Sequence, residues 1–568
     1  MDTTIHAHNS LVSDSEALAL SGGPVRRIQN LSAVGGDWQA PEYVIDRVVL
    51  ADDGILYLDE EHSDDMRVMS YISRLRLNRV TFEQRKVSHS EIKRLQQAAK
   101  DGASLSIAEG QGNAKTAQQE QINRMISEAA RLGASDIHFL PDVEKTYVKY
   151  RINGIPEARF TLDRGVAEDL VSTLYTSMCE KPDNYEPSRK QNARLMERYA
   201  RQSGLFVCRI ATGPAARGRK LVIRLYPDTG DTPKSMSELG FLPEQCAQIR
   251  QFARKTSGIV LVTGTTGSGK STTLNHYLKQ ALLQSEGELI IATAEDPVEQ
   301  PIRVVTIRNG AEVVYVAVQE PIIPAGTSEE DVEAAWVDAI DHMLRSDPDS
   351  ILIGEIRGKA SVRSAIRAAL TGHPTLATLH VKDAISAFDR LEDSGVPRNL
   401  LTDPTLFIGI INQALVPVLC PHCSIPFSDA EANMEQGLRD RVRRFCDASG
   451  VRVRGAGCPN CRRGLVGRTV CAEVVSPNPA LMAVYRKHGT FAAQKHWVQK
   501  MGGITQCAHL TRLIEAGLVD PDLGELMVRP LDSDDWLNEG VLRRRTGASR
   551  SRSPKSIISH WKAHHGKA

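Results

Sequence analysis

The stretch from Gly264 to Ser271 limits the possible folds of this chain more than any other part of the sequence. It reads Gly264-Thr265-Thr266-Gly267-Ser268-Gly269-Lys270-Ser271, which fits the phosphate-binding pattern G-x-x-x-x-G-K-[ST]. The apolar run from Ile259 to Val262 precedes it and predicts a buried strand. The residues that follow carry leucines at helical spacing, at Leu274, Leu278 and Leu282. A strand, a glycine-rich loop and a helix in this order predict an α/β domain.

A loop of this kind binds phosphate mainly through its backbone. Glycines let successive N–H groups point inward around the phosphates, and the first turn of the helix adds the positive end of its dipole. Lys270 is expected to reach the β and γ phosphates, and the Ser271 hydroxyl to hold Mg²⁺. The predicted nucleotide-binding residues are Gly264, Thr265, Thr266, Gly267, Ser268, Gly269, Lys270, Ser271 and Thr272. A turn without a ligand is the alternative, and the flanking strand and helix argue against it.

Two acidic segments follow strand-like runs farther along the chain. Glu295-Asp296-Pro297-Val298-Glu299 comes after the run from Leu289 to Ala292, and the ligands of α/β sheets bind at that edge. These carboxylates can order Mg²⁺ or its waters, and a solvated acidic turn fits the spacing equally well. The run from Ser350 to Ile353 ends in Gly354-Glu355, without the metal-binding aspartate that is usual in P-loop enzymes. Glu355 is therefore predicted to orient or deprotonate the attacking water.

Histidines and arginines add further candidates. His373 and His380 lie at the two ends of a strand-like run, a placement that fits phosphate sensing and a structural role equally well. Arg209 and Arg224 each lie inside a strand-like run, where periodicity alone favours a solvated strand face. A neighbouring nucleotide that needs cations would reverse that interpretation.

Four of the ten cysteines form two C-x-x-C knuckles. The pairs are Cys420 with Cys423, and Cys458 with Cys461. Two such knuckles can place four thiolates tetrahedrally around Zn²⁺, at about 2.3 Å from the metal. A redox pair is disfavoured because the two knuckles are equivalent. Cys446 and Cys471 lack a knuckle and remain as substitute ligands.

The composition sets limits on size, location and partners. A length of 568 residues predicts about three or four domains. With 70 basic and 69 acidic residues, the chain has no overall field that would attract nucleic acid or membrane. No apolar run approaches the roughly 18–20 residues that span a bilayer, and the first residues are too polar for a signal peptide, so a cytosolic protein is expected. The basic end after Leu542 favours a disordered, solvated tail over one that contacts lipid or nucleic acid.

Changes in composition and pattern divide the chain into segments. Those with candidate chemistry are the α+β domain, the P-loop core and the zinc-binding subdomain. For the N-terminal interaction domain, a partly disordered arm is the alternative. The expected boundaries are an N-terminal interaction domain (1–97), a linker (98–116), an α+β domain (117–227), a connector (228–237), a P-loop core (238–415), a zinc-binding subdomain (416–476), a helical part (477–530) and a basic tail (531–568).

Several motifs occur in one order along this chain. They are Ala134-Ser135-Asp136-Ile137-His138, Tyr150-Arg151-Ile152-Asn153-Gly154, the P-loop, Glu295 to Glu299, Leu344-Arg345-Ser346-Asp347-Pro348-Asp349 with Gly354-Glu355-Ile356-Arg357, and His373 to His380. In this order the motifs resemble those of the assembly ATPases of type II secretion and type IV pilus systems, over roughly residues 117–530.

This resemblance implies a RecA-like P-loop ATPase core preceded by a PAS-like α+β domain, assembled as a ring-shaped homohexamer. The residues to which it assigns catalytic roles are Lys270, Arg209, Arg224, Glu295, Glu299, Glu355, His373 and His380. Glu355 would activate water, the two arginines would reach a nucleotide, and the two histidines would respond to the γ-phosphate of ATP. Hydrolysis would drive a polytopic inner-membrane platform protein that moves pilin subunits, with the enzyme peripheral at the cytoplasmic face of the membrane.

The chain departs from the family pattern at four places. Thr265 stands in place of proline, and Asn192-Ala193 in place of Asp-Gly. Gly358-Lys359-Ala360 replaces acidic residues, and the stretch from Val304 to Val337 is unusually long. These departures are typical of a divergent branch, such as a plasmid-borne or type IVb-like pilus system.

Three alternatives remain. A pilus-retraction ATPase shares most of the motifs, but the four knuckle cysteines argue against it. A DNA-uptake or conjugative motor has the basic tail as its local support, although nucleic acid is not the expected partner. A nucleotide-switched scaffold would bind ATP without turnover, and the intact Lys270, Ser271 and Glu355 argue against it.

Overall fold

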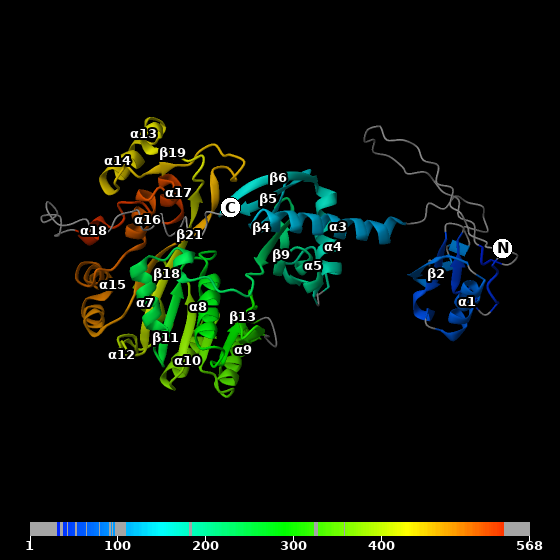
Figure 1. The fold of residues 1–568 in the computed structure, drawn as a ribbon, viewed down its shortest axis with the longest axis horizontal. Helices are drawn as coiled ribbons and strands as arrows, with labels where there is room; N and C mark the ends of the chain where they lie inside the picture. Colours follow the sequence, from blue (N-terminus) through cyan, green and yellow to red (C-terminus); the bar gives the residue numbers. More distant parts are fainter. Residues whose placement is uncertain are drawn as a thin grey trace. The chain divides into compact units, whose positions relative to one another are not determined.

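The chain folds as two units, Met1–Gln121 and Ile122–Ala568 (Figure 1). The computed structural model describes residues 31–33, 38–42, 44–51, 54–63, 65–78, 80–89, 92–93, 95–96, 109–180, 184–322, 328–356 and 358–538. The predicted tail beyond residue 538, residues 98–108 of the predicted linker, and Arg357 lie outside the described residues.

In the first unit, a three-stranded sheet packs with an amphipathic helix. The strands are β1 (Val48–Leu50), β2 (Ile55–Asp59) and β3 (Glu83–Val87), antiparallel between β1 and β2 and parallel between β2 and β3, with the short helix η1 (Glu60–His62) after β2. Helix α1 (Met66–Leu77) begins after Asp65, whose side chain accepts a hydrogen bond from the N–H of Arg67. The helix buries residues three and four positions apart, namely Val68, Tyr71, Ile72 and Leu75. This unit therefore has an apolar core of its own.

Helix α3 (Glu109–Arg131) begins inside the segment that was predicted as a linker. Residues 109–116 are helical, although the sequence predicted a linker from 98 to 116. The segment is rich in Ala, Gln, Glu and Lys, which are good helix formers, and two early glycines concealed that preference.

The second unit begins with an antiparallel sheet of seven strands, in the order β6-β5-β4-β10-β9-β8-β7. The strands are β4 (Ala134–Pro141), β5 (Lys145–Ile152), β6 (Ile155–Asp163), β7 (Cys179–Glu180), β8 (Gln191–Leu195), β9 (Leu205–Ala215) and β10 (Gly218–Pro227). Helices α3 and α4 (Arg164–Met178) bury their apolar residues against this sheet, and α5 (Glu197–Gln202) precedes β9. This arrangement is the α+β layer that the sequence predicted.

Charged residues occupy strand positions between those of the apolar core. Because side chains alternate along a strand, these charges project from the face opposite to that core. Asp136, Arg209 and Arg224 are neighbours on this face, since Arg224 is opposite Asp136 on β4 and opposite Arg209 on β9. Alternation thus explains arginines within strands.

The core of the second unit is another seven-stranded sheet, in the order β15-β12-β16-β17-β11-β18-β21. Its strands are β11 (Gly258–Thr263), β12 (Ile291–Glu295), β15 (Val318–Pro321), β16 (Ser350–Ile353), β17 (Pro374–Leu379), β18 (Phe407–Leu419) and β21 (Leu465–Val475). Neighbouring strands are parallel, except that β21 runs antiparallel to β18. A hairpin of β13 (Arg303–Arg308) and β14 (Ala311–Val316) belongs to the long segment that departs from the family pattern.

Helices cover both faces of this sheet. Ile259 and Leu261 of β11 belong to one apolar cluster, and Val260 and Val262 belong to another. The first cluster includes α9 (Glu329–Met343), α10 (Lys359–Leu370) and α11 (Ser386–Asp393), and the second includes α7 (Pro243–Phe252) and α8 (Lys270–Gln284). The short helix α6 (Met236–Leu239) belongs to the second cluster and α12 (Arg398–Leu401) to the first. The sheet is therefore buried on both sides, as parallel sheets are.

The C-terminal third contains the cysteine knuckles and the predicted helices. Between β18 and β21 lie β19 (Ile425–Pro426), α13 (Phe427–Ala430), η2 (Glu431–Asn433), α14 (Gln436–Phe445) and β20 (Arg452–Val453). After β21 come α15 (Pro479–Met501), α16 (Gln506–Glu515), α17 (Pro521–Met527) and α18 (Asp535–Asn538). Leu531 and Leu537 are buried, so the first residues of the predicted basic tail are packed against the fold.

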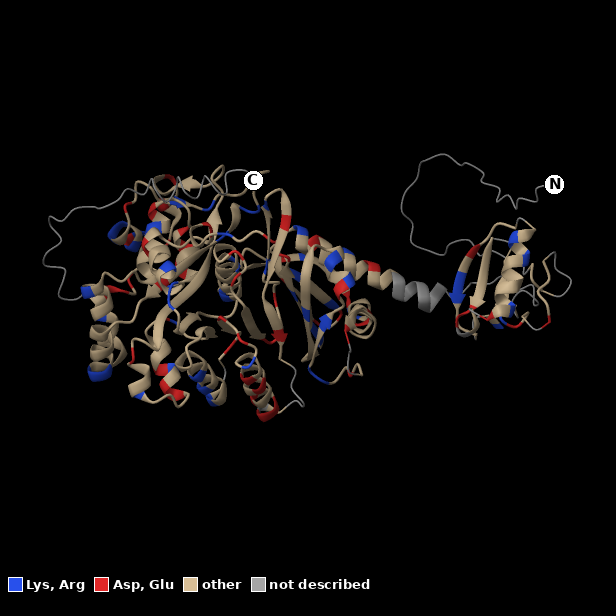
Figure 2. Cartoon of the chain, turned by 60° about the horizontal axis from the view of Figure 1, so that its bottom comes forward, with Lys and Arg blue, Asp and Glu red and all other residues tan. Residues whose placement is uncertain are grey.

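The distribution of charged residues agrees with the nearly equal numbers of basic and acidic residues in the sequence. Lys and Arg are interspersed with Asp and Glu over the elements of the second unit (Figure 2). Among the described residues, no helix is both long enough and apolar enough to cross a lipid bilayer.

Candidate nucleotide site and cysteine cluster

The phosphate loop joins β11 to α8, as the sequence predicted. Gly264, Gly267 and Gly269 have φ angles of 139°, 80° and 87°, which residues other than glycine rarely adopt. A Cβ on Gly264 would also lie 2.3 Å from the carbonyl oxygen of Gln413. Glycine is therefore required at the start of this loop for both its conformation and its packing.

Lys270 is the first residue of α8 and is mostly buried. Its Nζ donates hydrogen bonds to the carbonyl oxygens of Gly264, at 3.0 Å, and Thr265, at 3.1 Å. Burial lowers the pKa of Lys270 to about 8, and the negative charges of Glu355 and Glu299 oppose that shift. The lysine is thus held by the loop itself, within the electrostatic reach of two predicted catalytic acids.

Other residues of the loop fit a phosphate ligand with Mg²⁺. Thr265, Thr266 and Gly267 at the tip of the loop are exposed, and so is Ser271. The Ser268 hydroxyl is buried and has no hydrogen-bond partner within the described parts of the chain. A loop with an exposed tip and an unused hydroxyl donor suits an anion with several oxygen atoms.

The acidic candidates lie at the same edge of the sheet as the loop. Glu295 ends β12, Glu355 follows β16 and His380 follows β17, and all three strands are parallel to β11 or to its neighbours. His380 Nε2 lies 3.5 Å from Glu355 Oε1. In this arrangement the carboxylate can accept a proton from a water molecule, and the imidazole can orient that carboxylate.

Glu295 is fixed by donors on neighbouring strands. Its Oε1 accepts hydrogen bonds from Thr293 Oγ1, at 2.7 Å, and from Gln319 Nε2, at 2.9 Å. Burial raises the pKa of Glu295 above its ordinary value, and the two donors oppose that shift. Glu295 is therefore held in place by two hydrogen bonds.

Glu299 connects the core to the α+β domain. Its Oε1 accepts a hydrogen bond from the Tyr226 hydroxyl, at 2.8 Å, and lies 3.9 Å from a guanidinium nitrogen of Arg209. Burial raises the pKa of Tyr226 to about 12, so the hydroxyl remains a donor at neutral pH. The sequence did not predict Tyr226 as a site residue, and its place at the end of a strand-like run was the available signal.

Arg224 has a different partner. Its Nε donates a hydrogen bond to Asp136 Oδ1 at 2.9 Å, and the Asp136 carboxylate is almost completely buried. Arg209 therefore lies closer to the predicted acidic segment of the core than Arg224 does, although the family resemblance implied the same role for both arginines.

His373 is separated from the phosphate loop within one chain. It precedes Pro374, the first residue of β17, which is opposite Gly258 at the start of β11. The phosphate loop follows the other end of β11, and a strand of six residues is about 20 Å long. His373 Nδ1 instead lies 3.1 Å from Thr371 Oγ1 and 3.3 Å from the carbonyl oxygen of Ala368. Within one chain, therefore, His380 is near the loop and His373 is not.

The connector between the α+β domain and the core is fastened to helix α8. Lys279, whose side chain is fully buried, donates hydrogen bonds to Thr229 Oγ1, at 3.0 Å, and to the Gly230 carbonyl, at 2.7 Å. His276 Nδ1 accepts a hydrogen bond from the N–H of Lys234 at 3.2 Å. Burial lowers the pKa of His276 to about 4, which keeps the ring neutral and able to accept. No sequence pattern indicated this clamp, because a lysine and a histidine on a helix usually face solvent.

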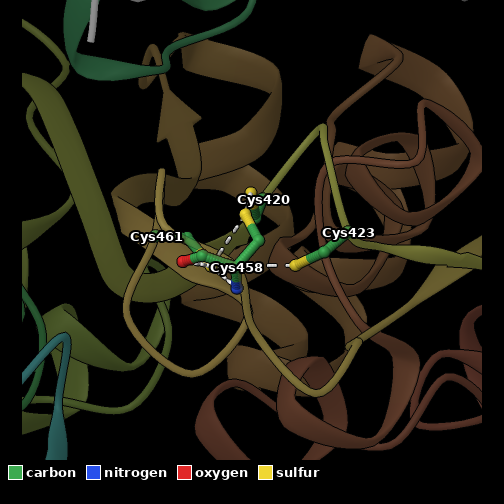
Figure 3. A group of neighbouring side chains, drawn as sticks. All are labelled: Cys420, Cys423, Cys458 and Cys461. Atoms are coloured by element: carbon green, nitrogen blue, oxygen red, sulfur yellow. Dashed lines mark hydrogen bonds between the residues drawn. The ribbon is translucent and has the colours of Figure 1, made fainter.

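The four knuckle cysteines converge at the ends of β18 and β21 (Figure 3). Cys420, Cys423, Cys458 and Cys461 bring their sulfur atoms within 4.8 Å of one another. The predicted substitutes are not part of this group: Cys471 Sγ donates to the Gln506 carbonyl, and burial raises the pKa of Cys446 to about 12. Four clustered thiols with the spacing of two knuckles fit a tetrahedral zinc site.

The second knuckle also contacts the α+β domain. Arg462, which follows Cys461, donates from Nε to Glu157 Oε2 on β6 at 2.8 Å. Glu157 has 11% of its side chain exposed. Ile155 of the same strand packs against an apolar cluster of Leu419, Leu465 and Leu523. The cysteine subdomain therefore supports the edge of the antiparallel sheet.

Comparison with known proteins places this chain in a family. Residues 112–519 match the family model described as Type II/IV secretion system protein. The chain belongs to this family. The match includes the α+β sheet, the phosphate loop and the cysteine cluster of this secretion-family protein.

Curated relatives of this secretion-family protein include ATPases of both systems. The Type II secretion system ATPase E of Vibrio cholerae is 32% identical over 382 residues, which are 66% of this chain and 68% of that protein. The Type IV pilus assembly ATPase TfpB of Acinetobacter baylyi is 32% identical over 387 residues, 67% of this chain and 60% of that protein. The X-ray structure of the Legionella pneumophila ATPase DotB has a TM-score of 0.49 at 20% identity, over 71% of this chain and 94% of that one.

Proposed function

We propose that this chain is an ATPase that hydrolyses ATP to power assembly of a type IV pilus or of the pseudopilus of a type II secretion system. One observation carries the proposal: a single sheet edge bears the phosphate loop, the Glu355–His380 pair and the acidic segment that ends in Glu299. Phosphoryl transfer to water needs a cradle for the phosphates and a group that orients the water. Family membership and the pilus and secretion ATPases among the relatives support the biological process.

Each residue has a proposed part in this reaction. Lys270 exchanges its two carbonyl partners for the β and γ phosphates, and Ser271 holds Mg²⁺. When bound, Mg²⁺ neutralises part of the phosphate charge. Glu355 orients and deprotonates the attacking water, and His380 holds the carboxylate in place and responds to the γ-phosphate. Glu295 and Glu299 order the waters around the metal.

Arg209 is the arginine most ready to contact the nucleotide. In the structure it lies near Glu299 at a partly exposed position, with 40% of its side chain accessible. Arg224 would first have to leave the buried Asp136 carboxylate, which costs more because this buried charge would keep only Arg151, at 3.8 Å, as an ion-pair partner among the described residues. A guanidinium placed at a developing phosphate charge stabilises the transition state.

The proposed assembly is a ring-shaped homohexamer. It would act at the cytoplasmic face of the inner membrane, as a peripheral partner of a polytopic platform protein and the pilin assembly machinery. RecA-like cores and PAS-like α+β domains would form its two layers. The cysteine cluster would hold a structural Zn²⁺ that stiffens the subdomain beside β6, because Arg462 follows a ligand directly.

The test is Mg²⁺-dependent ATP hydrolysis by purified protein separated by size, with Arg209→Ala beside Arg217→Ala. The two variants are matched, since Arg217 also belongs to the β9–β10 region and pairs with a carboxylate, that of Asp142, at 2.7 Å. We expect hydrolysis in the hexameric fraction, its loss in Arg209→Ala, and its retention in Arg217→Ala. Equal rates of hydrolysis in the monomer and in both variants would overturn the proposal of a ring-shaped motor. The absence of hydrolysis in every fraction would overturn the proposed ATPase activity.

A further inference from the structure

Two adjacent side chains of β18, Asn412 and Gln413, are almost completely buried next to the nucleotide site. Their exposed fractions are 0% and 1%. β18 pairs in parallel with β11, and Asn412 is opposite Thr263, the last strand residue before the phosphate loop. Because successive side chains of a strand point to opposite faces, the two amides leave the sheet on different sides, at the level where the loop begins.

Gln413 holds the backbone of the phosphate loop. Its Nε2 donates a hydrogen bond to the Ser268 carbonyl at 2.8 Å. In a trans peptide the carbonyl and the following N–H point in opposite directions, so this bond turns the N–H of Gly269 away from Gln413. Gly269 is also in tight contact, since a Cβ there would lie 3.2 Å from the same nitrogen. Gln413 therefore fixes the orientation of a peptide whose N–H belongs to the phosphate cradle.

Asn412 connects the end of the P-loop strand to the segment that carries His380. Its Nδ2 donates hydrogen bonds to Thr263 Oγ1, at 2.9 Å, and to the Val381 carbonyl, at 3.2 Å. Its Oδ1 accepts a hydrogen bond from Gln506 Nε2 at 2.6 Å. Both donors and the acceptor oxygen of the amide are thus in use. Val381 follows His380 directly, so this tie restrains the backbone that places the imidazole beside Glu355.

We propose that Asn412 and Gln413 are positioning residues for ATP hydrolysis, an inference that rests on the proposed function. Gln413 presets the phosphate loop and therefore determines the affinity for the nucleotide. Asn412 sets the position of His380 relative to Glu355 and therefore determines the rate of the chemical step. Neither side chain is expected to touch the nucleotide.

The test compares Gln413→Met with Gln245→Met. Gln245 is also 1% exposed and also donates from Nε2 to a backbone carbonyl, that of Ala472 at 2.6 Å, but on another side of the core. Both variants lose a buried hydrogen bond from Nε2 to a carbonyl, and Gln245→Met also loses the bond that Gln245 Oε1 accepts from the N–H of Leu242, at 3.0 Å. Thermal unfolding measures their loss of stability, and Gln413→Leu is the second variant if Gln413→Met does not fold.

For Gln413→Met we expect the KM for ATP to rise about tenfold, with kcat changed less than about twofold, because a buried carbonyl loses its donor. Gln245→Met should keep both constants, even though it loses two buried hydrogen bonds. For Asn412→Leu we expect the opposite split, with kcat lowered about tenfold and KM nearly unchanged.

Binding of ATP is measured in parallel with turnover, so that two kinds of failure are separable. A parent protein that binds but does not hydrolyse ATP would overturn the proposed function and the role of Asn412, while the Kd values still decide the role of Gln413. Equal KM and Kd values in Gln413→Met and Gln245→Met would overturn the role of Gln413. An unchanged kcat in Asn412→Leu would overturn that of Asn412.

Discussion

Replacing Cys458 with serine tests whether the cysteine cluster holds zinc. The sulfur atom of Cys458 lies 3.7 Å from that of Cys420 and 3.6 Å from that of Cys461, and the sulfur atoms of Cys423 and Cys461 are 3.7 Å apart. The edge of a regular tetrahedron is about 1.63 times the distance from its centre to a corner, so Zn–S bonds of about 2.3 Å predict edges of about 3.8 Å. Three of the six sulfur–sulfur distances thus match the edge of a zinc tetrahedron, and all six are within 4.8 Å.

The loss of one ligand has a predictable magnitude. Structural zinc sites bind with about 10–16 kcal/mol, so removing one of four thiolates weakens binding by about 3 kcal/mol, or at least about 100-fold. We expect the parent protein to hold one zinc per chain after dialysis against a moderate chelator, and Cys458→Ser to hold almost none. Because Arg462 follows a ligand, the variant should also lose thermal stability.

Zinc content measured by plasma mass spectrometry, with unfolding followed by calorimetry, decides this prediction. Cys446→Ser is the matched control, since Cys446 lies in the same subdomain but outside the cluster. Burial raises the pKa of Cys446 to about 12, which leaves a neutral thiol and a poor ligand. Equal zinc loss in the two variants, or a parent protein without zinc, would refute the reasoning.

Three further predictions concern the active site, pH and the contact between domains. Glu355→Gln should bind ATP normally and release phosphate at least about 100-fold more slowly, because the water loses its base; rapid phosphate release would contradict the assignment. Burial raises the pKa of Glu473 from 4.5 to about 7, so its contribution to the free energy of unfolding, of the order of 3 kcal/mol, is present below pH 4.5 and is lost as pH rises through 7. Urea titrations of Glu473→Gln should therefore show a flatter pH dependence in that range, and an unchanged slope would count against the shift. Arg462→Ala should speed proteolysis of the α+β domain severalfold, because it breaks the partly buried contact with Glu157. The control is Arg463→Ala, which removes an exposed neighbouring arginine and should leave the cleavage rate unchanged. Identical cleavage rates of the two variants would show that the contact is not stabilising.

Local motifs were predictable because their chemistry requires fixed spacing along the chain. The phosphate loop and the two knuckles each need a few residues in a set order. In the structure the loop joins a strand to a helix, and the four knuckle cysteines lie close to one another, as expected. Glu355 could be assigned for a similar reason, since it is the first acid after a buried strand and strands of a parallel sheet end at one edge. Such predictions depend on sequence neighbours rather than on the pairing of distant strands.

Residues that depend on strand direction or pairing were not predictable. The sequence placed His373 and His380 at the two ends of a strand-like run, but only the parallel pairing of β17 with β11 shows that the end with His380 lies at the phosphate loop. Asn412 and Gln413 become important only through the register of β18 with β11, more than a hundred residues away in sequence. Arg224 looked equivalent to Arg209 until pairing with β4 placed Asp136 beside it. These assignments require a three-dimensional register, which local periodicity does not contain.

The clamp between α8 and the connector links the phosphate loop mechanically to the connector through this helix. Lys270 begins the helix at the phosphate loop, and Lys279, nine residues farther, grips the connector. At 1.5 Å per residue the two side chains start about 14 Å apart along one stiff rod. A tilt of about 10° at the phosphate end would therefore displace the connector by about 2 Å, through simple rotation of a rod of that length. The chain thus contains a direct mechanical connection from the phosphate loop to the domain that carries Arg209.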